Sequence, residues 1–256
     1  MDAPDNRTGS APAAWGLPAL FLLSGACGLV YQVLWARMLI VVFGATLPAV
    51  STVLSAFMAG LALGSFCFGR RIDRVRRPLF VFAALEAGIG LFAFLFPHLL
   101  GATGWLAEAG WTGRHPAAFA AVRFALAFGL LLVPTAAMGA TLPVISRSAV
   151  RRFSRLGSGV GLLYAANTLG AVAGVAGVTF YLMEELGLRG SGYAVGMVNL
   201  LVASLACWIG RRGVSQPEEE DSPERVPEPA PETRPAEAAG FLPLPPLALK
   251  PIRTAF

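Results

Sequence analysis

Long apolar runs alternate with short polar connections along most of the chain. Six of these runs reach the length of about 20 residues that a helix needs to cross the hydrocarbon core of a bilayer. They extend from Leu17 to Phe43, Leu47 to Phe68, Leu79 to Leu100, Ala117 to Ile145, Val160 to Met183, and Gly192 to Ile209. The pattern predicts an all-α integral membrane protein with six transmembrane helices.

The arginines between these runs predict how the spans are oriented. Arginine is dense in alternate connections, with Arg70, Arg71, Arg74, Arg76 and Arg77 after the second run, Arg147, Arg151, Arg152 and Arg155 after the fourth, and Arg211 and Arg212 after the sixth. The intervening connections hold only Arg114 and Arg189, so the count is eleven against two. The positive-inside rule then places both termini in the cytoplasm. The expected location is a bacterial inner membrane.

Composition supports this class and excludes others. Hydrophobic residues make up 55% of the 256 residues and charged residues only 14%, whereas an average soluble domain is about 25% charged. The net charge is +5. Most of the basic residues lie in short clusters beside apolar runs, which is typical of membrane topology signals. We therefore expect membrane lipid as a partner and no nucleic acid.

Three regions follow from these boundaries. Residues 1–16 form a short cytoplasmic segment, residues 17–212 the transmembrane domain, and residues 213–256 a tail rich in Pro and Glu. The tail holds ten of the 19 prolines and eight acidic residues, a composition that does not support a packed core. It is interpreted as a disordered end or, alternatively, as a strip that docks on a partner.

Polar residues inside spans are costly and are candidate functional residues. Glu86 in the third run is the strongest candidate, and Asn167 and Tyr164 lie at a similar depth in the fifth, so a contact between them is plausible. Tyr31 and Gln32 complete the set of candidate substrate-binding residues. Glu86 is interpreted either as a cation or proton site or as a hydrogen-bonded clamp between helices.

Two further patterns concern structure more than chemistry. Arg37 and Arg123 lie in the outer parts of their spans, where they either attract an anion or extend toward the headgroups. Two Gly-x-x-x-Gly patterns, Gly60 with Gly64 and Gly170 with Gly174, predict close helix packing. No catalytic motif or metal-ligand cluster is evident, so no cofactor, no metal and no catalysis by this chain alone are expected.

Five segments stand out in order along the chain: residues 24–37 (SGACGLVYQVLWAR), 51–64 (STVLSAFMAGLALG), 85–90 (LEAGIG), 138–143 (MGATLP) and 161–171 (GLLYAANTLGA). Together they resemble one family, the bacterial fused major-facilitator-like/spermidine synthases. The resemblance covers the membrane domain and implies a bundle like one half of a major facilitator. Residues 69–77 (GRRIDRVRR) also resemble the loop between the second and third spans of major facilitators, which implies bracing and gating roles for Asp73 and Arg74.

The chain departs from this family in two ways. Gln32 stands where the family usually has Glu, and the tail is too short for the aminopropyltransferase domain that follows in typical members. We therefore expect a polyamine-related transporter-like module, or a membrane anchor for a separately encoded synthase, and a homodimer because six spans are half a facilitator. The alternative is a structural or accessory subunit of a larger membrane complex, with the tail docking on partners.

Overall fold

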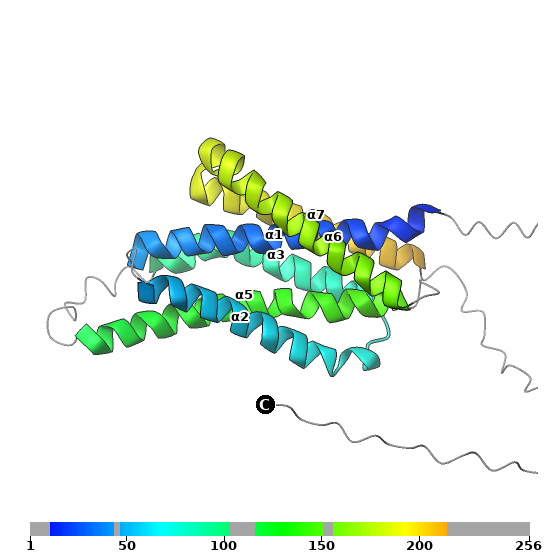
Figure 1. Cartoon of the computed structure of the whole chain (residues 1–256), viewed down its shortest axis with the longest axis horizontal. Coiled ribbons are helices and arrows are strands. Elements are labelled where there is room, and N and C mark those ends of the chain that lie inside the picture. The colour runs from blue at the N-terminus through cyan, green and yellow to red at the C-terminus, as the bar shows by residue number, and fades with distance from the viewer. Residues whose placement is uncertain (1–10, 44–46, 103–115, 151–155, 214–256) are drawn as a thin grey trace, which may run out of the picture. The chain divides into compact units, whose positions relative to one another are not determined.

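The computed structural model describes residues 11–43, 47–102, 116–150 and 156–213, and these residues are helical apart from short connections. The elements are α1 (Ala11–Phe43), α2 (Leu47–Gly69), the short 3-10 helix η1 (Ile72–Arg74), α3 (Pro78–Ala102), α5 (Pro116–Val150), α6 (Leu156–Gly177), the π-helical turn η2 (Val178–Leu182) and α7 (Met183–Gly213) (Figure 1). The predicted all-α class is confirmed. Residues 1–10 and 214–256, which include nearly all of the predicted tail, lie outside the described residues.

Five helical segments are long and apolar enough to cross a membrane. They are Gly16–Ile40, Val50–Gly69, Pro78–Ala102, Phe124–Ala149 and Gly159–Arg212. The last covers 54 residues, about 80 Å if it were straight, which is far longer than a bilayer core of about 30 Å. It contains both the fifth and the sixth of the predicted runs, and in Figure 1 the chain turns back between α6 and α7.

The turn depends on Gly187, which has φ 65° and ψ −176° inside the helical stretch. Residues with a Cβ rarely adopt this backbone conformation. The Ser191 hydroxyl lies within hydrogen-bonding distance of the Leu182 carbonyl (2.8 Å) and the Gly187 carbonyl (2.6 Å). Ser191 thus supplies a donor at the place where the helical backbone ladder is interrupted.

Glycines hold the helices together in three close pairs. A Cβ at Gly60 would overlap Thr135, which brings α2 against α5, and a Cβ at Gly170 would overlap the Leu22 carbonyl, which brings α1 against α6. A Cβ at Gly90 would lie 2.9 Å from the Gly196 carbonyl, where α3 meets α7. The packing role predicted for the Gly-x-x-x-Gly patterns is confirmed, since close approach of helix backbones requires such positions.

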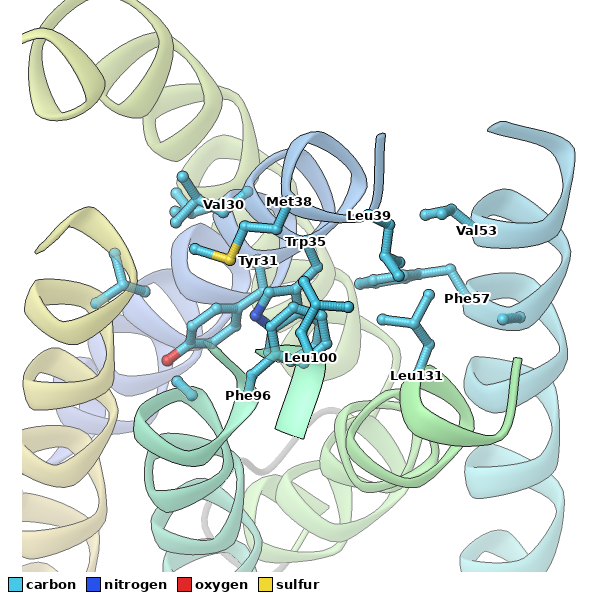
Figure 2. Close-up of a cluster of buried hydrophobic side chains, with 14 of the residues drawn as sticks. Val30, Tyr31, Trp35, Met38, Leu39, Val53, Phe57, Phe96, Leu100 and Leu131 are labelled. Atoms are coloured by element: carbon cyan, nitrogen blue, oxygen red, sulfur yellow. The ribbon is translucent and has the colours of Figure 1, made fainter. Parts of the chain in front are cut away.

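Two apolar clusters lie toward opposite ends of the bundle. In one of them, drawn in Figure 2, the Trp35 ring stacks on Tyr31 at a centroid distance of 4.8 Å and on Phe96 at 4.9 Å, with Phe57 beside it. The other contains buried residues of α1, α3, α5, α6 and α7, among them Phe21 and Phe82. Ser24 on α1 and Glu86 on α3, which are considered below, lie between the two clusters along these helices.

The described arginine clusters share one end of the bundle. The connection between α2 and α3 is joined to the end of α5 by an ion pair between Asp73 and Arg147, 3.3 Å apart. The ring of Phe80, at the start of α3, lies against Gly210 near the end of α7. We call this the basic end; its described arginines are Arg70, Arg71, Arg74, Arg76, Arg77, Arg147, Arg211 and Arg212.

Candidate functional site

A cavity of about 300 Å³ lies between the helices, with walls contributed by α1, α2, α3, α5, α6 and α7. Its polar lining residues are Ser24, Gln32, Ser65, Glu86, Thr141, Tyr164, Asn167 and Asn199. Tyr164 lines the cavity and is nevertheless 63% exposed, so the cavity opens on the side of α6 that carries this ring. Cavities between the helices of a bundle are common ligand sites.

The α1 wall is polar because of its residue spacing. Ser24, Gly28 and Gln32 follow one another at intervals of four residues and so lie on one face of the helix. An added Cβ at Gly28 would have nothing within 4 Å, so this glycine leaves space between the two polar side chains. The face spans about 12 Å along the helix axis.

The Glu86 carboxyl group is fully buried and accepts a hydrogen bond on each oxygen. Ser24 Oγ donates to Oε1 at 2.5 Å, and Asn199 Nδ2 donates to Oε2 at 2.5 Å. Tyr31 Oη in turn donates to Asn199 Oδ1 at 2.9 Å. The network ties α1, α3 and α7 together in the middle of the bundle, and hydrogen bonds to a carboxylate are among the stronger ones in proteins.

The contact of Glu86 with Asn167 or Tyr164 that the sequence made plausible is not the one observed. Asn167 and Tyr164 line the same cavity as Glu86, but the recorded partners of the carboxyl group are Ser24 and Asn199. Asn167 instead packs against α1, where a Cβ at Gly25 would lie 2.6 Å from its Oδ1. Depth along a span indicates which residues share a layer and leaves open which of them touch.

The five candidate binding residues therefore fall into three groups. Tyr31 is fully buried, does not line the cavity, and acts on it through Asn199. Glu86 is part of the wall. Gln32, Tyr164 and Asn167 are polar residues that line the cavity. Within the described part of the chain, the side-chain amides of Gln32 and Asn167 make no hydrogen bond.

Sequence reasoning missed Ser24 and Asn199, the two residues that hold Glu86. Asn199 is a polar residue within a predicted span, so the criterion that selected Asn167 applies to it equally. Ser24 carries a weaker signal, because serine in a helix often bonds to its own backbone, as Ser204 does with the Leu200 carbonyl.

The candidate gating and structural residues are less closely connected. Asp73 is paired with Arg147, a partner that the sequence did not indicate, and Arg74 is exposed in η1. Arg37 is exposed on α1. The backbone of Arg123 belongs to α5, and its side chain lies outside what the structure describes. In the described part of the chain, no group of three or more His, Cys, Asp and Glu side chains is arranged to hold a metal ion.

An all-helical bundle with apolar spans and a polar internal cavity defines a multi-pass membrane protein of the transporter-like class. The model of the Major Facilitator Superfamily matches residues 16–255, and the chain belongs to that superfamily. A curated relative, Polyamine aminopropyltransferase 2 of Streptomyces coelicolor, is 30% identical over 199 residues, which are 75% of this chain and 33% of the relative. The chain thus spans about a third of that relative's length. No solved structure matches the chain.

Proposed function

We propose that the chain is a transporter-like module whose cavity binds a small organic cation of the polyamine class. The observation that carries the proposal is the charge of the cavity wall. Among the described residues that line it, Glu86 is the single carboxylic acid, and none is Lys, Arg or His. A carboxylate interacts with a cation much more strongly in low-dielectric surroundings than in water, so such a wall favours cations and disfavours anions.

The other polar lining residues suit the same ligand. Ammonium groups are donors only and need oxygen acceptors once they leave water. Gln32 and Asn167 line the cavity and carry amide oxygens that can accept hydrogen bonds. The Tyr164 ring offers a face for a cation–π contact. The cavity volume of about 300 Å³ lies at the lower end of the usual range for ligand sites, which favours a slender solute.

Access to Glu86 depends on Ser24. The carboxyl group is 0% exposed, so a cation in the cavity reaches it only after the Ser24 hydroxyl turns away from Oε1. Ser24 is half-buried and lines the cavity, so its hydroxyl has space in which to turn. Asn199 continues to hold Oε2 and keeps the carboxyl group in place while the ligand replaces the serine.

The polyamine class is proposed from the name of the relative, since aminopropyl transfer to polyamines belongs to that protein. A companion role is proposed on the same ground, namely that the domain anchors a separately encoded synthase in the membrane.

Spermidine binding by the purified protein in nanodiscs tests the cation site. Glu86→Gln keeps the size of the side chain and removes its charge, and we expect the dissociation constant to rise about 10- to 100-fold. Glu184→Gln is the matched control, because Glu184 is exposed on α7 and outside the cavity, and it should bind as the wild type does. If Glu86→Gln and the wild type melt at similar temperatures and bind spermidine with equal affinity, the proposal is rejected.

The same proposal includes six spans with both termini in the cytoplasm of a bacterial inner membrane. Two observations support it: the 54-residue segment turns back at Gly187, and the described arginine clusters share one end. Arginine accumulates on the cytoplasmic side of inner-membrane proteins.

We also propose that a second copy of the chain covers the open side of the cavity. Exposed residues flank the cavity at identical spacings on its two sides, Ser51, Ser55, Met58 and Ala62 on α2 and Gly161, Ala165, Thr168 and Val172 on α6. We call these the flanking rows. Most of their members are small, as at helix–helix contacts in membranes, and the amides of Gln32 and Asn167 would otherwise be near lipid, which offers them no hydrogen bonds. A second copy would bring matching rows and its own polar cavity wall.

A further inference from the structure

The seam between α3 and α7 at the basic end combines two arginines with an aromatic contact. Arg77 immediately precedes α3, and its guanidinium lies 5.9 Å from the centre of the Phe80 ring. That ring lies against Gly210, which is followed directly by Arg211. Arg77 contacts the Phe80 ring, and Arg211, 134 positions away in the sequence, directly follows the residue that packs against it. Both arginines are exposed.

No carboxylate neutralises this pair within the described residues. Asp73 is the acidic residue of the basic end, and it is bound to Arg147 at 3.3 Å. The charges of Arg77 and Arg211 are therefore available to an external anion. Arginine matches the geometry of a phosphate, because each guanidinium presents parallel N–H donors to phosphate oxygens.

Small residues continue from these arginines along the lipid-facing side of the seam. Ala84 and Gly88 follow Arg77 by seven and eleven positions on α3, and Ser204 precedes Arg211 by seven positions on α7, so each set shares a helix face. All three are exposed, and a Cβ added at Gly88 would meet nothing within 4 Å. Larger exposed side chains, Leu91 and Leu201, come next toward the membrane interior.

Beside this seam, the basic end carries a marker of the membrane surface. The guanidinium of Arg212 lies 3.7 Å above the Trp208 ring, which is 50% exposed. Tryptophan is enriched at the level of the headgroups. Arg211 directly precedes Arg212, and Arg77 contacts the Phe80 ring that packs against Gly210. Both arginines of the seam are therefore near the depth where lipid phosphates are found.

We infer that the α3–α7 seam is a binding site for an acidic phospholipid. Arg77 and Arg211 hold the phosphodiester, the Phe80 ring supports the headgroup, and an acyl chain lies over Ala84, Gly88 and Ser204. Basic sites between membrane helices on the cytoplasmic side bind acidic lipid headgroups by the same physics. This site is separate from the cavity and does not depend on the proposed cation.

Native mass spectrometry of the protein released from mixed bilayers of phosphatidylglycerol and phosphatidylcholine tests the site. At about 1 kcal/mol for each arginine near the surface, we expect phosphatidylglycerol to be retained at least about tenfold over phosphatidylcholine. The double variant Arg77→Gln/Arg211→Gln should lose this preference. The double variant Arg70→Gln/Arg71→Gln removes the same charge from the same end on a different element, and it should keep the preference.

Two further measurements distinguish binding of a lipid from binding of a soluble phosphate compound. Gly88→Leu fills the seam without changing charge, and it should weaken phosphatidylglycerol retention while leaving thermal stability in pure phosphatidylcholine unchanged. Soluble glycerol 3-phosphate should not displace the lipid. The inference is overturned if both double variants lose the lipid equally, if the wild type shows no preference, or if glycerol 3-phosphate competes and Gly88→Leu has no effect.

Discussion

At the scale of single residues, Asn199 has the central position in the site. Its amide group donates to Glu86 with one end and accepts from Tyr31 with the other, and it is 1% exposed. An amide side chain is suited to this place because it carries a donor and an acceptor on one rigid group. Tyr31 fixes the orientation of Asn199, and Asn199 fixes that of Glu86.

Truncating the Asn199 side chain should therefore lower the free energy of unfolding by more than the loss of one ordinary hydrogen bond does. Asn199→Ala leaves Glu86 Oε2 and the Tyr31 hydroxyl without partners, and we expect a loss of about 1–3 kcal/mol for each buried group left unsatisfied. Tyr31→Phe leaves one such group, Asn199 Oδ1, without its partner, so it should lower the free energy of unfolding by about 1–3 kcal/mol, less than Asn199→Ala does. Thermal unfolding in nanodiscs measures both. The comparison variant is Ser204→Ala, whose exposed hydroxyl bonds only to its own helix; similar melting temperatures for Ser204→Ala and Asn199→Ala would contradict this account.

At the scale of the elements, Gly187 separates α6 and η2 from most of α7. Gly187→Ala places a Cβ on a backbone with φ 65°, which should destabilise the protein by about 1–3 kcal/mol. Gly177→Ala is the matched control, because Gly177 has φ −61° and open space around its Cβ position, and alanine there should be neutral or stabilising. Thermal unfolding of the two variants measures this difference in stability. Equal stabilities of Gly187→Ala and Gly177→Ala would show that the turn tolerates other backbone conformations.

The elements were more predictable than their partners. Apolar runs locate the helices because a bilayer demands about 20 apolar residues for each span. Glycine spacing indicated that α2 and α6 each pack closely against another helix. Sequence does not tell that Gly170 meets Leu22 or that Gly90 meets Gly196, since such pairs depend on how distant segments are arranged. For the same reason Glu86 was identified as a candidate, while its partners Ser24 and Asn199 were not.

At the scale of the whole molecule, the basic end allows a direct test of orientation. If it faces the cytoplasm, a cysteine introduced by Arg76→Cys should react with an impermeant maleimide only in inside-out vesicles. A cysteine introduced by Arg189→Cys, on the exposed residue just after the Gly187 turn, should react only in intact cells or spheroplasts. Three predicted spans, the third to the fifth, separate the two positions. Labelling of both cysteines from the same side would contradict this topology, because an odd number of spans must place them on opposite sides.

The proposed second copy gives the last test at this scale. Ala62 and Ala165 belong to the two flanking rows and lie at similar distances, about 10–14 Å, from the helix ends at the basic end. In a background with Cys67→Ser and Cys207→Ser, the pair Ala62→Cys and Ala165→Cys should form disulfide-linked dimers in native membranes, because a two-fold interface repeats each contact. Leu91→Cys with Leu201→Cys, on the lipid-facing sides of α3 and α7, should remain monomeric. Dimers from the second pair alone would place the interface on α3 and α7 and leave the cavity open to lipid.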